Sequence, residues 1–265
     1  MSYLELARLR SAALTRTFDL RYNLISALVE RWRPETHTFH LPCRECTVTL
    51  EDVALHFGLP IDGNVVTGVS TIAEPAALCY SLLGASPGDD ESNFLELKFT
   101  WLKASFEHLS VNVTEEELMC AARAYIMHII GGVLMPNANY NKVHLQYLPL
   151  LADLHNVRTY SWGSAVLAML YRELCRTTKP DTFIWISYRK PEIATVIPSS
   201  AYVHSQLWCT NAPIISFNVV EWYHGDRVLR QFGCIQHIPD PPMQVGKVHG
   251  INKRGKHGMH WEVVY

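Results

Sequence analysis

The residues that most resemble a metal site in this sequence are two histidines and two cysteines spaced three apart. They are His37, His40, Cys43 and Cys46. Imidazole and thiolate groups are the usual ligands of structural zinc, and a Cys-x-x-Cys turn often supplies half of such a site. Residues 36–41, however, form an extended pattern, and side chains three apart on a strand point to opposite faces. We therefore expect a strand, a turn and a strand in which the full set does not converge, with zinc binding as the open alternative.

A second group of histidines lies towards the C-terminal end, among basic residues and glycines. Its members are His249, His257 and His260, with Lys247, Lys253, Arg254 and Lys256 beside them. Basic, glycine-rich stretches are typical of phosphate-contacting or nuclear-targeting segments. Short basic runs also arise by chance, so the alternative is an exposed tail without a role of its own.

Motifs for nucleophilic and nucleotide chemistry are incomplete. Residues 160–164 only loosely resemble a serine elbow, because they lack the Gly-x-Ser-x-Gly pattern and follow no clear strand. Ser161 is better explained as a helix N-cap. The run His224-Gly225-Asp226-Arg227 has residue types found in metallophosphatases, but the other metal-binding segments of such an enzyme are missing, and no glycine-rich phosphate-binding motif is present. We expect no catalytic residue, no metal and no cofactor.

The composition indicates a packed globular protein. Of 265 residues, 48% are hydrophobic and 18% are charged, and the formal net charge is −2. These values exclude intrinsic disorder and leave no overall basic field that would attract nucleic acid. The length suits one large domain or two small ones.

The cysteines and the hydrophobic runs indicate a compartment. Seven cysteines are spread thinly over the chain, which favours a reducing intracellular environment over a secreted disulfide scaffold. The N-terminal residues do not form a signal peptide. The longest uncharged run, between Arg123 and Lys142, loses its apolar character after Pro136 and is too short to span a membrane. We interpret it as a buried helix end.

Hydrophobic periodicity and capping residues predict a mainly α-helical globular domain with a few short β-strands, an α+β fold with many helices. Helices are expected over 3–16, 19–32, 50–57, 75–83, 92–109, 115–130, 143–155, 162–174, 200–208 and 227–232. Strands are expected over 36–41, 46–48, 183–188 and 214–220. The expected helix caps are Thr49, Thr114 with Glu117, Ser161 and Asp226. The helix over 19–32 would place Leu24, Ile25 and Trp32 on one apolar stripe.

Several longer stretches match, in order, the segments of one known family. They are RWRPETHTFHLP at 31–42, TVTLEDVAL at 47–55, GLPIDG at 58–63, DLHN at 153–156, YSWGSAVLA at 160–168, YRELCR at 171–176, VEWY at 220–223 and DRVLRQFG at 226–233. Together they run over most of the chain. The sequence therefore resembles the plant mobile domain, which occurs in maintenance-of-meristems (MAIN-like) proteins and in transposon-encoded relatives.

The resemblance implies a nuclear plant protein that acts in transcriptional regulation, transposon silencing and meristem maintenance. It implies MAIN-like or phosphatase-7-like proteins as partners. Some members are fused to a phosphatase and some are described as aminotransferase-like, but neither activity is expected here. The phosphatase motifs are missing, and no lysine lies in the context that a Schiff base to pyridoxal phosphate requires.

The resemblance also implies domain boundaries and one departure from the family. We expect the plant mobile domain to cover 1–238 and an irregular C-terminal tail to cover 239–265. Family members carry a further helical segment after the helix that ends near residue 176, whereas residues 177–181 join the neighbouring blocks directly in this chain. The domain is therefore expected to be shortened between 176 and 182.

The leading hypothesis is a non-enzymatic interaction module. Trp222, Arg227 and Arg230 are residue types that are enriched at the centres of protein interfaces, although they also serve as ordinary core and ion-pair residues. One alternative is a transposon-derived module that binds nucleic acid through the basic tail. A second alternative is a metal-dependent hydrolase or nuclease, which the histidine and cysteine content suggests.

Overall fold

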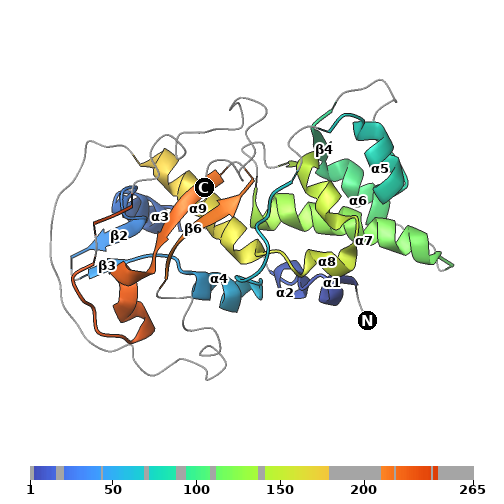
Figure 1. The fold of residues 1–265 in the computed structure, drawn as a ribbon. Helices are drawn as coiled ribbons and strands as arrows, with labels where there is room; N and C mark the ends of the chain where they lie inside the picture. The colour runs from blue at the N-terminus through green and yellow to red at the C-terminus, as the bar shows by residue number, and fades with distance from the viewer. Residues whose placement is uncertain are drawn as a thin grey trace. The chain divides into compact units, whose positions relative to one another are not determined.

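The computed structural model describes residues 3–15, 21–42, 44–68, 72–87, 94–107, 112–136, 141–178, 210–217, 219–239 and 241–243. These residues are mostly helical, with short antiparallel strands in small sheets (Figure 1). The expected fold class is therefore confirmed. Cys43, the strand expected over 183–188, the helix expected over 200–208 and the basic histidine group lie outside the described residues.

The chain divides into two compact units. The first contains the described parts of 1–15 and 57–161, and the second contains those of 16–56 and 162–252. The elements of the first unit are α1 (Tyr3–Leu6), α2 (Arg10–Ala13), α5 (Pro75–Leu83), β4 (Glu96–Lys98), α6 (Phe99–Glu107), α7 (Glu115–Ile129), the π-helical turn η1 (Ile130–Leu134), β5 (Lys142–His144), the 3-10 helix η2 (Leu145–Leu151) and α8 (Leu154–Val157).

Helix α7 forms the centre of the first unit. Thr114 and Glu117 form the expected capping box, in which the threonine hydroxyl accepts from the Glu117 N–H and the glutamate accepts from the Thr114 N–H. The continuous stretch Glu115–Leu134 is 20 residues long and apolar enough to cross a membrane by length and composition, but half of its apolar window is buried. Such burial is usual for the core helix of a globular unit.

A buried arginine connects α7 to its neighbours. The Arg123 guanidinium donates to the carbonyl oxygens of Leu151 at 3.0 Å, Ala152 at 3.0 Å and Leu82 at 3.3 Å. These carbonyls belong to the ends of η2 and α5, where helical carbonyls lack partners along the chain. Arg123 therefore satisfies them and joins three helices.

The second unit combines two small sheets with long and short helices (Figure 1). Its elements are α3 (Tyr22–Val29), β1 (Trp32–Arg33), β2 (Thr38–Leu41), β3 (Arg44–Cys46), α4 (Leu50–Phe57, which ends at the boundary with the first unit), α9 (Trp162–Thr177), β6 (Asn211–Ser216), β7 (Val219–His224) and the 3-10 helix η4 (Gly225–Phe232). Strands β1, β2 and β3 form an antiparallel sheet in that order, and β6 pairs with β7 as a hairpin.

The helix boundaries with clear local signals are where the sequence predicts them. Thr49 caps α4, because its hydroxyl accepts from the Asp52 N–H at 3.1 Å. Pro75 starts α5, and Gly84 ends it in the left-handed conformation with φ of 73°. Gly233 ends η4 in the same way. Pro and Gly act here through their own backbone preferences, which need no distant partner.

Several expected elements near the N-terminal end are wrong in extent or type. The helix expected over 3–16 is two short helices, because Arg8 adopts a positive φ of 55° between them. Trp32 lies in β1 opposite Phe39, not on the helix stripe. The helix expected over 92–109 begins only at Phe99, because residues 96–98 pair with β5.

Further corrections apply to the C-terminal half. The helix expected over 143–155 is a strand end, a 3-10 helix around Pro149 and the short α8. The strand expected over 214–220 is a hairpin that turns at Phe217, where φ is 50°. Asp226 lies inside η4 and is not its cap. The strand expected over 46–48 ends at Cys46, and Leu170, which was expected to face inward, is 38% exposed.

Candidate functional site

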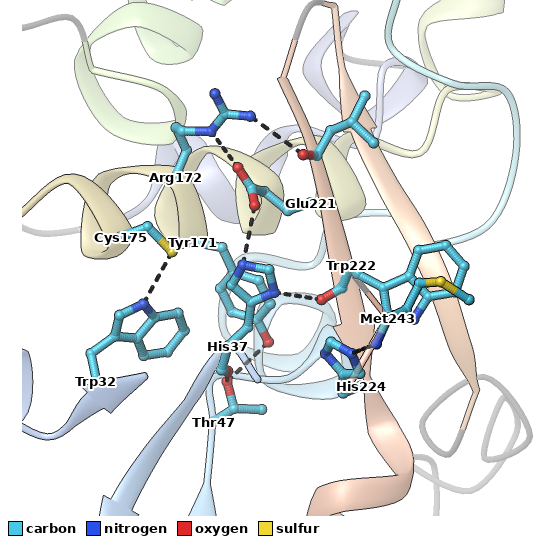
Figure 2. Close-up of polar contacts among 11 residues, drawn as sticks. Trp32, His37, Thr47, Tyr171, Arg172, Cys175, Glu221, Trp222, His224 and Met243 are labelled. Carbon is cyan, nitrogen blue, oxygen red and sulfur yellow. Dashed lines mark hydrogen bonds and ion pairs between the residues drawn. The ribbon is translucent and has the colours of Figure 1, made fainter. Parts of the chain in front are cut away.

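Among the described residues of the second unit, several polar side chains form a buried network around Glu221 of β7 (Figure 2). The Glu221 side chain is fully buried and pairs through one carboxylate oxygen with the Arg172 guanidinium of α9. Its other oxygen lies 3.1 Å from Nε2 of His37. Arg172 also donates to the Val220 carbonyl at 3.3 Å. One carboxylate therefore lies between two cationic or potentially cationic groups from different elements.

His37 is held in one orientation by both ring nitrogens. Its Nδ1 donates to the Trp222 carbonyl at 2.7 Å, while Nε2 faces Glu221. Its imidazole stacks on the Tyr171 ring, with centroids 5.0 Å apart and planes inclined by 19°. The residue adopts a positive φ of 51°, which is uncommon for a side chain of this size. The surrounding contacts compensate for that local backbone cost.

Tyr171 and Thr47 extend the network towards β3. The Tyr171 hydroxyl donates to the Val48 carbonyl at 2.8 Å and lies 2.9 Å from the Thr47 hydroxyl, which donates to the His37 carbonyl at 2.6 Å. Complete burial raises the pKa of Tyr171 well above its ordinary value. The phenol therefore stays protonated and acts as a fixed donor.

A thiol lies at the edge of the same group (Figure 2). The Trp32 indole N–H donates to the Cys175 sulfur at 3.2 Å. Burial raises the pKa of the Cys175 thiol to about 12. A nucleophilic cysteine needs a lowered pKa, so Cys175 is a packing residue in this arrangement.

His224 connects the hairpin to the segment that follows η4. Its Nε2 accepts from the Met243 N–H at 3.2 Å. Burial, His37 and Arg227 together lower the pKa of His224 to about 4. The imidazole is therefore neutral at neutral pH, as an accepting nitrogen must be.

A second, half-buried group surrounds Glu45 of β3. Its carboxylate lies 3.3 Å from Nη1 of Arg227, accepts from the Thr38 hydroxyl at 3.1 Å and lies 3.7 Å from Nε2 of His40. Burial is the main cause that lowers the pKa of His40. Nearby, the side-chain amide of Gln231 accepts a hydrogen bond from the Thr47 N–H at 2.8 Å and donates one to the Thr47 carbonyl at 3.0 Å. These contacts attach η4 to the β1–β2–β3 sheet.

Of the four residues that resemble a zinc site, Cys43 lies outside the described residues, and the other three are not brought together. His37 faces Glu221, whereas His40 faces Glu45, and Cys46 lies opposite Phe39 in the strand register. No group of three or more His, Cys, Asp or Glu side chains among the described residues could hold a metal ion. The strand expected over 36–41 begins only at Thr38, and His37 precedes it with a positive φ of 51°, so its ring points away from His40 without being part of the strand.

Two of the three interface candidates make structural contacts. Arg227 pairs with Glu45 and its side chain is 11% exposed. The backbone carbonyl of Trp222 accepts from His37, and the Trp222 side chain is half-buried. Arg230 is exposed on η4. All three therefore stay predictions as interface residues, with Arg230 the most accessible.

Sequence reasoning missed Arg172 and Glu221 as a pair. Each lies among buried apolar neighbours, Arg172 beside Tyr171 on α9 and Glu221 between Val219 and Tyr223 on β7. A charged residue within an apolar pattern is a signal that it needs a buried partner. Its partner is 49 positions away, and no local pattern identifies it.

Chemically, the network resembles the histidine and carboxylate couple of a hydrolase without its nucleophile. The adjacent hydroxyl and thiol groups, Tyr171 and Cys175, both have raised pKa values. The carboxylate has no exposed surface. The arrangement is suited to joining α9, the hairpin and the β1–β2–β3 sheet.

Comparison with known proteins identifies the family. The sequence profile of the plant mobile domain matches residues 9–179 and 176–263. The chain belongs to the plant mobile domain family. A serine/threonine-protein phosphatase 7 long form homolog of Arabidopsis thaliana is 36% identical over 320 aligned positions, which cover 92% of this chain and 24% of that protein. No solved structure matches the chain.

Two further plant mobile domain relatives carry MAIN names. Protein MAINTENANCE OF MERISTEMS of Arabidopsis thaliana is 33% identical over 88% of this chain and 62% of its own length. Protein MAIN-LIKE 1 of the same plant is 43% identical over 59% of this chain and 31% of its own length. The chain thus spans between about a quarter and three fifths of these relatives.

The plant mobile domain match is divided at one place. Its two parts overlap at residues 176–179, next to the end of α9, and the shortening expected between 176 and 182 stays a prediction. The alignment to the phosphatase 7 long form homolog has 320 positions, more than the 265 residues of the chain. That relative therefore has residues that this chain lacks.

Proposed function

We propose that this plant mobile domain protein is a non-enzymatic interaction module. It would act in the nucleus, in transcriptional regulation, transposon silencing and meristem maintenance, with MAIN-like or phosphatase-7-like proteins as partners. Its similarity to a protein named for the maintenance of meristems and to a phosphatase 7 long form homolog supports these roles.

One observation carries the proposal. The residues with the most reactive chemistry, His37, Glu221 and Arg172, are buried and bonded to one another. A catalytic base or acid must reach a substrate proton within hydrogen-bonding distance, and side chains that are buried away from solvent do not. The network instead fixes the relative positions of α9, β7 and the β1–β2–β3 sheet, which supports a rigid surface for partners.

A binding experiment tests the proposal directly. The full chain is immobilised and exposed to purified MAINTENANCE OF MERISTEMS protein and to the phosphatase 7 long form homolog. We expect saturable binding to at least one of them, and about tenfold weaker binding by Arg230→Glu, because an exposed arginine on η4 can form charged contacts. The control is Arg158→Glu, which makes the same charge change at another exposed position. Absence of saturable binding to both proteins would contradict the proposal.

The same protein preparation distinguishes the nucleic-acid alternative. Binding through the basic tail would neutralise phosphates, so its affinity for duplex DNA would fall steeply as salt is raised. We expect no such binding at moderate salt. Tight binding with a strong salt dependence would favour the transposon-derived nucleic-acid module instead.

A further inference from the structure

His224 ends the second strand of the hairpin and contacts the segment that follows η4 (Figure 2). The residue is buried, with 5% of its surface exposed, and its Nε2 accepts from the Met243 N–H at 3.2 Å. A ring nitrogen accepts only when it carries no proton, so the single proton of this imidazole is on Nδ1. The contact therefore requires the neutral form of His224.

The described residues 241–243 offer a single backbone donor. Pro241 and Pro242 have no backbone N–H, so the Met243 N–H is the only one between residues 241 and 243. That N–H is the group that donates to His224. A buried imidazole thus binds this short segment at the one position where its backbone can donate.

The groups around His224 keep its ring neutral at neutral pH. His37 precedes β2, and its ring centroid lies 6.1 Å from that of His224. Burial, His37 and Arg227 of η4 lower the pKa of His224 to about 4. Asp226 of η4 and the Thr36 backbone favour the charged form, but they do not outweigh these effects. The contact with the following segment is therefore closed at neutral pH.

Protonation of His224 removes the acceptor from this contact. The added proton goes to Nε2, because Nδ1 already carries one. The Met243 N–H and the new Nε2–H then face each other, and neither can accept. Asn211, which lies opposite His224 on β6, does not titrate and so brings no compensating change of charge. The segment then loses the bond of its only backbone donor.

We propose that His224 is an acid-sensitive latch, which in its neutral form binds the segment 241–243 to the hairpin and releases it on protonation. The latch consists of one buried acceptor and one donor, and it does not depend on the proposed function. It differs from a loss of overall stability, because only this segment is expected to detach. Above about pH 4 the charged form is the minor one, so the segment stays bound.

Nuclear magnetic resonance of the full chain, with isotope-labelled methionine nitrogen, tests the latch. Met243→Leu assigns the Met243 amide signal by its disappearance, and the signal of Met127, which is buried in α7, reports on overall folding. We expect the Met243 signal to move with a midpoint at about pH 4 and its heteronuclear NOE to fall, while the Met127 signal stays in place. A Met243 signal that does not move, or that changes only together with Met127, would overturn the proposal.

Two substitutions at the same position make the test specific. Met243→Pro removes the N–H that donates to His224, whereas Met243→Leu retains it. Because the bond favours the neutral imidazole, its removal should raise the midpoint of the His224 titration by about half to one pH unit, the net effect of one hydrogen bond. The ring protons of His224 give this midpoint. Equal midpoints in the two variants would overturn the proposal.

His224→Gln provides a form that does not titrate. The glutamine amide oxygen can still accept from Met243, so we expect the Met243 signal to stay in place through about pH 4. His237→Gln is the matched control, because it makes the same change at an exposed position after η4 and leaves the latch intact. A His224→Gln chain that releases Met243 as the natural chain does would overturn the proposal.

Discussion

Arg172 and Glu221 form a buried ion pair that joins the middle of α9 to the second strand of the hairpin. The carboxylate is fully buried and the arginine side chain is 8% exposed. A buried pair contributes little net stability when both partners are present, but removal of one partner leaves a charge without compensation. The pair therefore makes the second unit sensitive to single substitutions.

The first prediction concerns this pair. Glu221→Ala should lower the free energy of unfolding by about 3–5 kcal/mol, because it leaves Arg172 and His37 facing an uncharged cavity. Urea denaturation followed by circular dichroism measures the effect. The matched control is Glu173→Ala, which breaks an exposed ion pair with Arg176 on the same helix and should cost at most about 1 kcal/mol. Equal effects for the two variants would contradict the described burial.

The double variant Arg172→Met with Glu221→Met refines the same test. Because both charges are removed together, we expect it to be more stable than either single variant. Coupling is tested by comparison with the single variants Arg172→Met and Glu221→Met. If the double variant loses as much free energy of unfolding as the two single variants together, the residues are not coupled.

The second prediction concerns acid pH. The pKa of His224 is lowered from 6.5 to about 4 in the folded chain. The unfolded chain therefore binds more protons between these two values, and the stability of the fold falls as pH decreases from about 6.5 to about 4. Burial also lowers the pKa values of His40 and His128, so the effect of His224 must be isolated.

The variant His224→Gln isolates the contribution of His224 to the pH dependence of stability. Glutamine does not titrate, and its amide oxygen can still accept from the Met243 N–H. Urea midpoints are compared between the natural chain and the variant at steps from pH 7 to pH 4. We expect the variant to lose less stability over this range. Parallel pH profiles would show that His224 does not contribute.

The third prediction separates a structural from a metal-binding role for His37. Because both of its ring nitrogens are engaged by Trp222 and Glu221, His37→Gln should lower the unfolding midpoint and leave the zinc content of the purified chain unchanged. Elemental analysis and denaturation of the same samples check this. His40→Gln serves as the control, since His40 lies at the longer distances of 3.7 Å from the half-buried Glu45 carboxylate and 3.5 Å from the Thr36 hydroxyl. Loss of bound zinc in His37→Gln would revive the hydrolase or nuclease alternative.

The fourth prediction concerns the start of α7. Thr114→Ala removes the hydroxyl that accepts from Glu117 and should cost about 1 kcal/mol. Thr114→Ser retains an accepting hydroxyl and should restore most of that stability. Thermal unfolding of the natural chain, Thr114→Ala and Thr114→Ser gives the order of their melting temperatures. An alanine variant as stable as the natural chain would contradict the capping box.

The capping boxes and the helix ends were predictable because their chemistry is local. Thr49, Thr114 and Pro75 act on residues within one turn, and Gly84 acts through its own φ. Trp32 was assigned to the wrong element because its apolar side chain fits a helix stripe as well as a strand. Its pairing with Phe39 decides between them, and short strands are chosen by such partners more than by their own composition.

The buried network around Glu221 could not be predicted from local sequence patterns, because it also depends on partners that are distant in the chain. His37, Arg172 and Glu221 come from segments far apart in sequence, and no local pattern identifies which of them pair with one another. The strand pattern of residues 36–41 predicts that His37 and His40 separate; they do, although β2 begins only at Thr38 and His37 is not part of it. It could not show that His37 turns inward towards β7, because that depends on its positive φ and on a partner that is 184 positions later.

Arg123 has a consequence for the first unit that apolar packing cannot supply. An apolar helix can shift along its axis by one turn, about 5.4 Å, and still bury a similar face. Such a shift would remove the guanidinium from the carbonyls of Leu82, Leu151 and Ala152 and leave its donors unpaired in the core. Arg123 therefore sets the axial register of α7. Lysine would not replace it, because an ammonium group lacks the planar fork that reaches several acceptors at once.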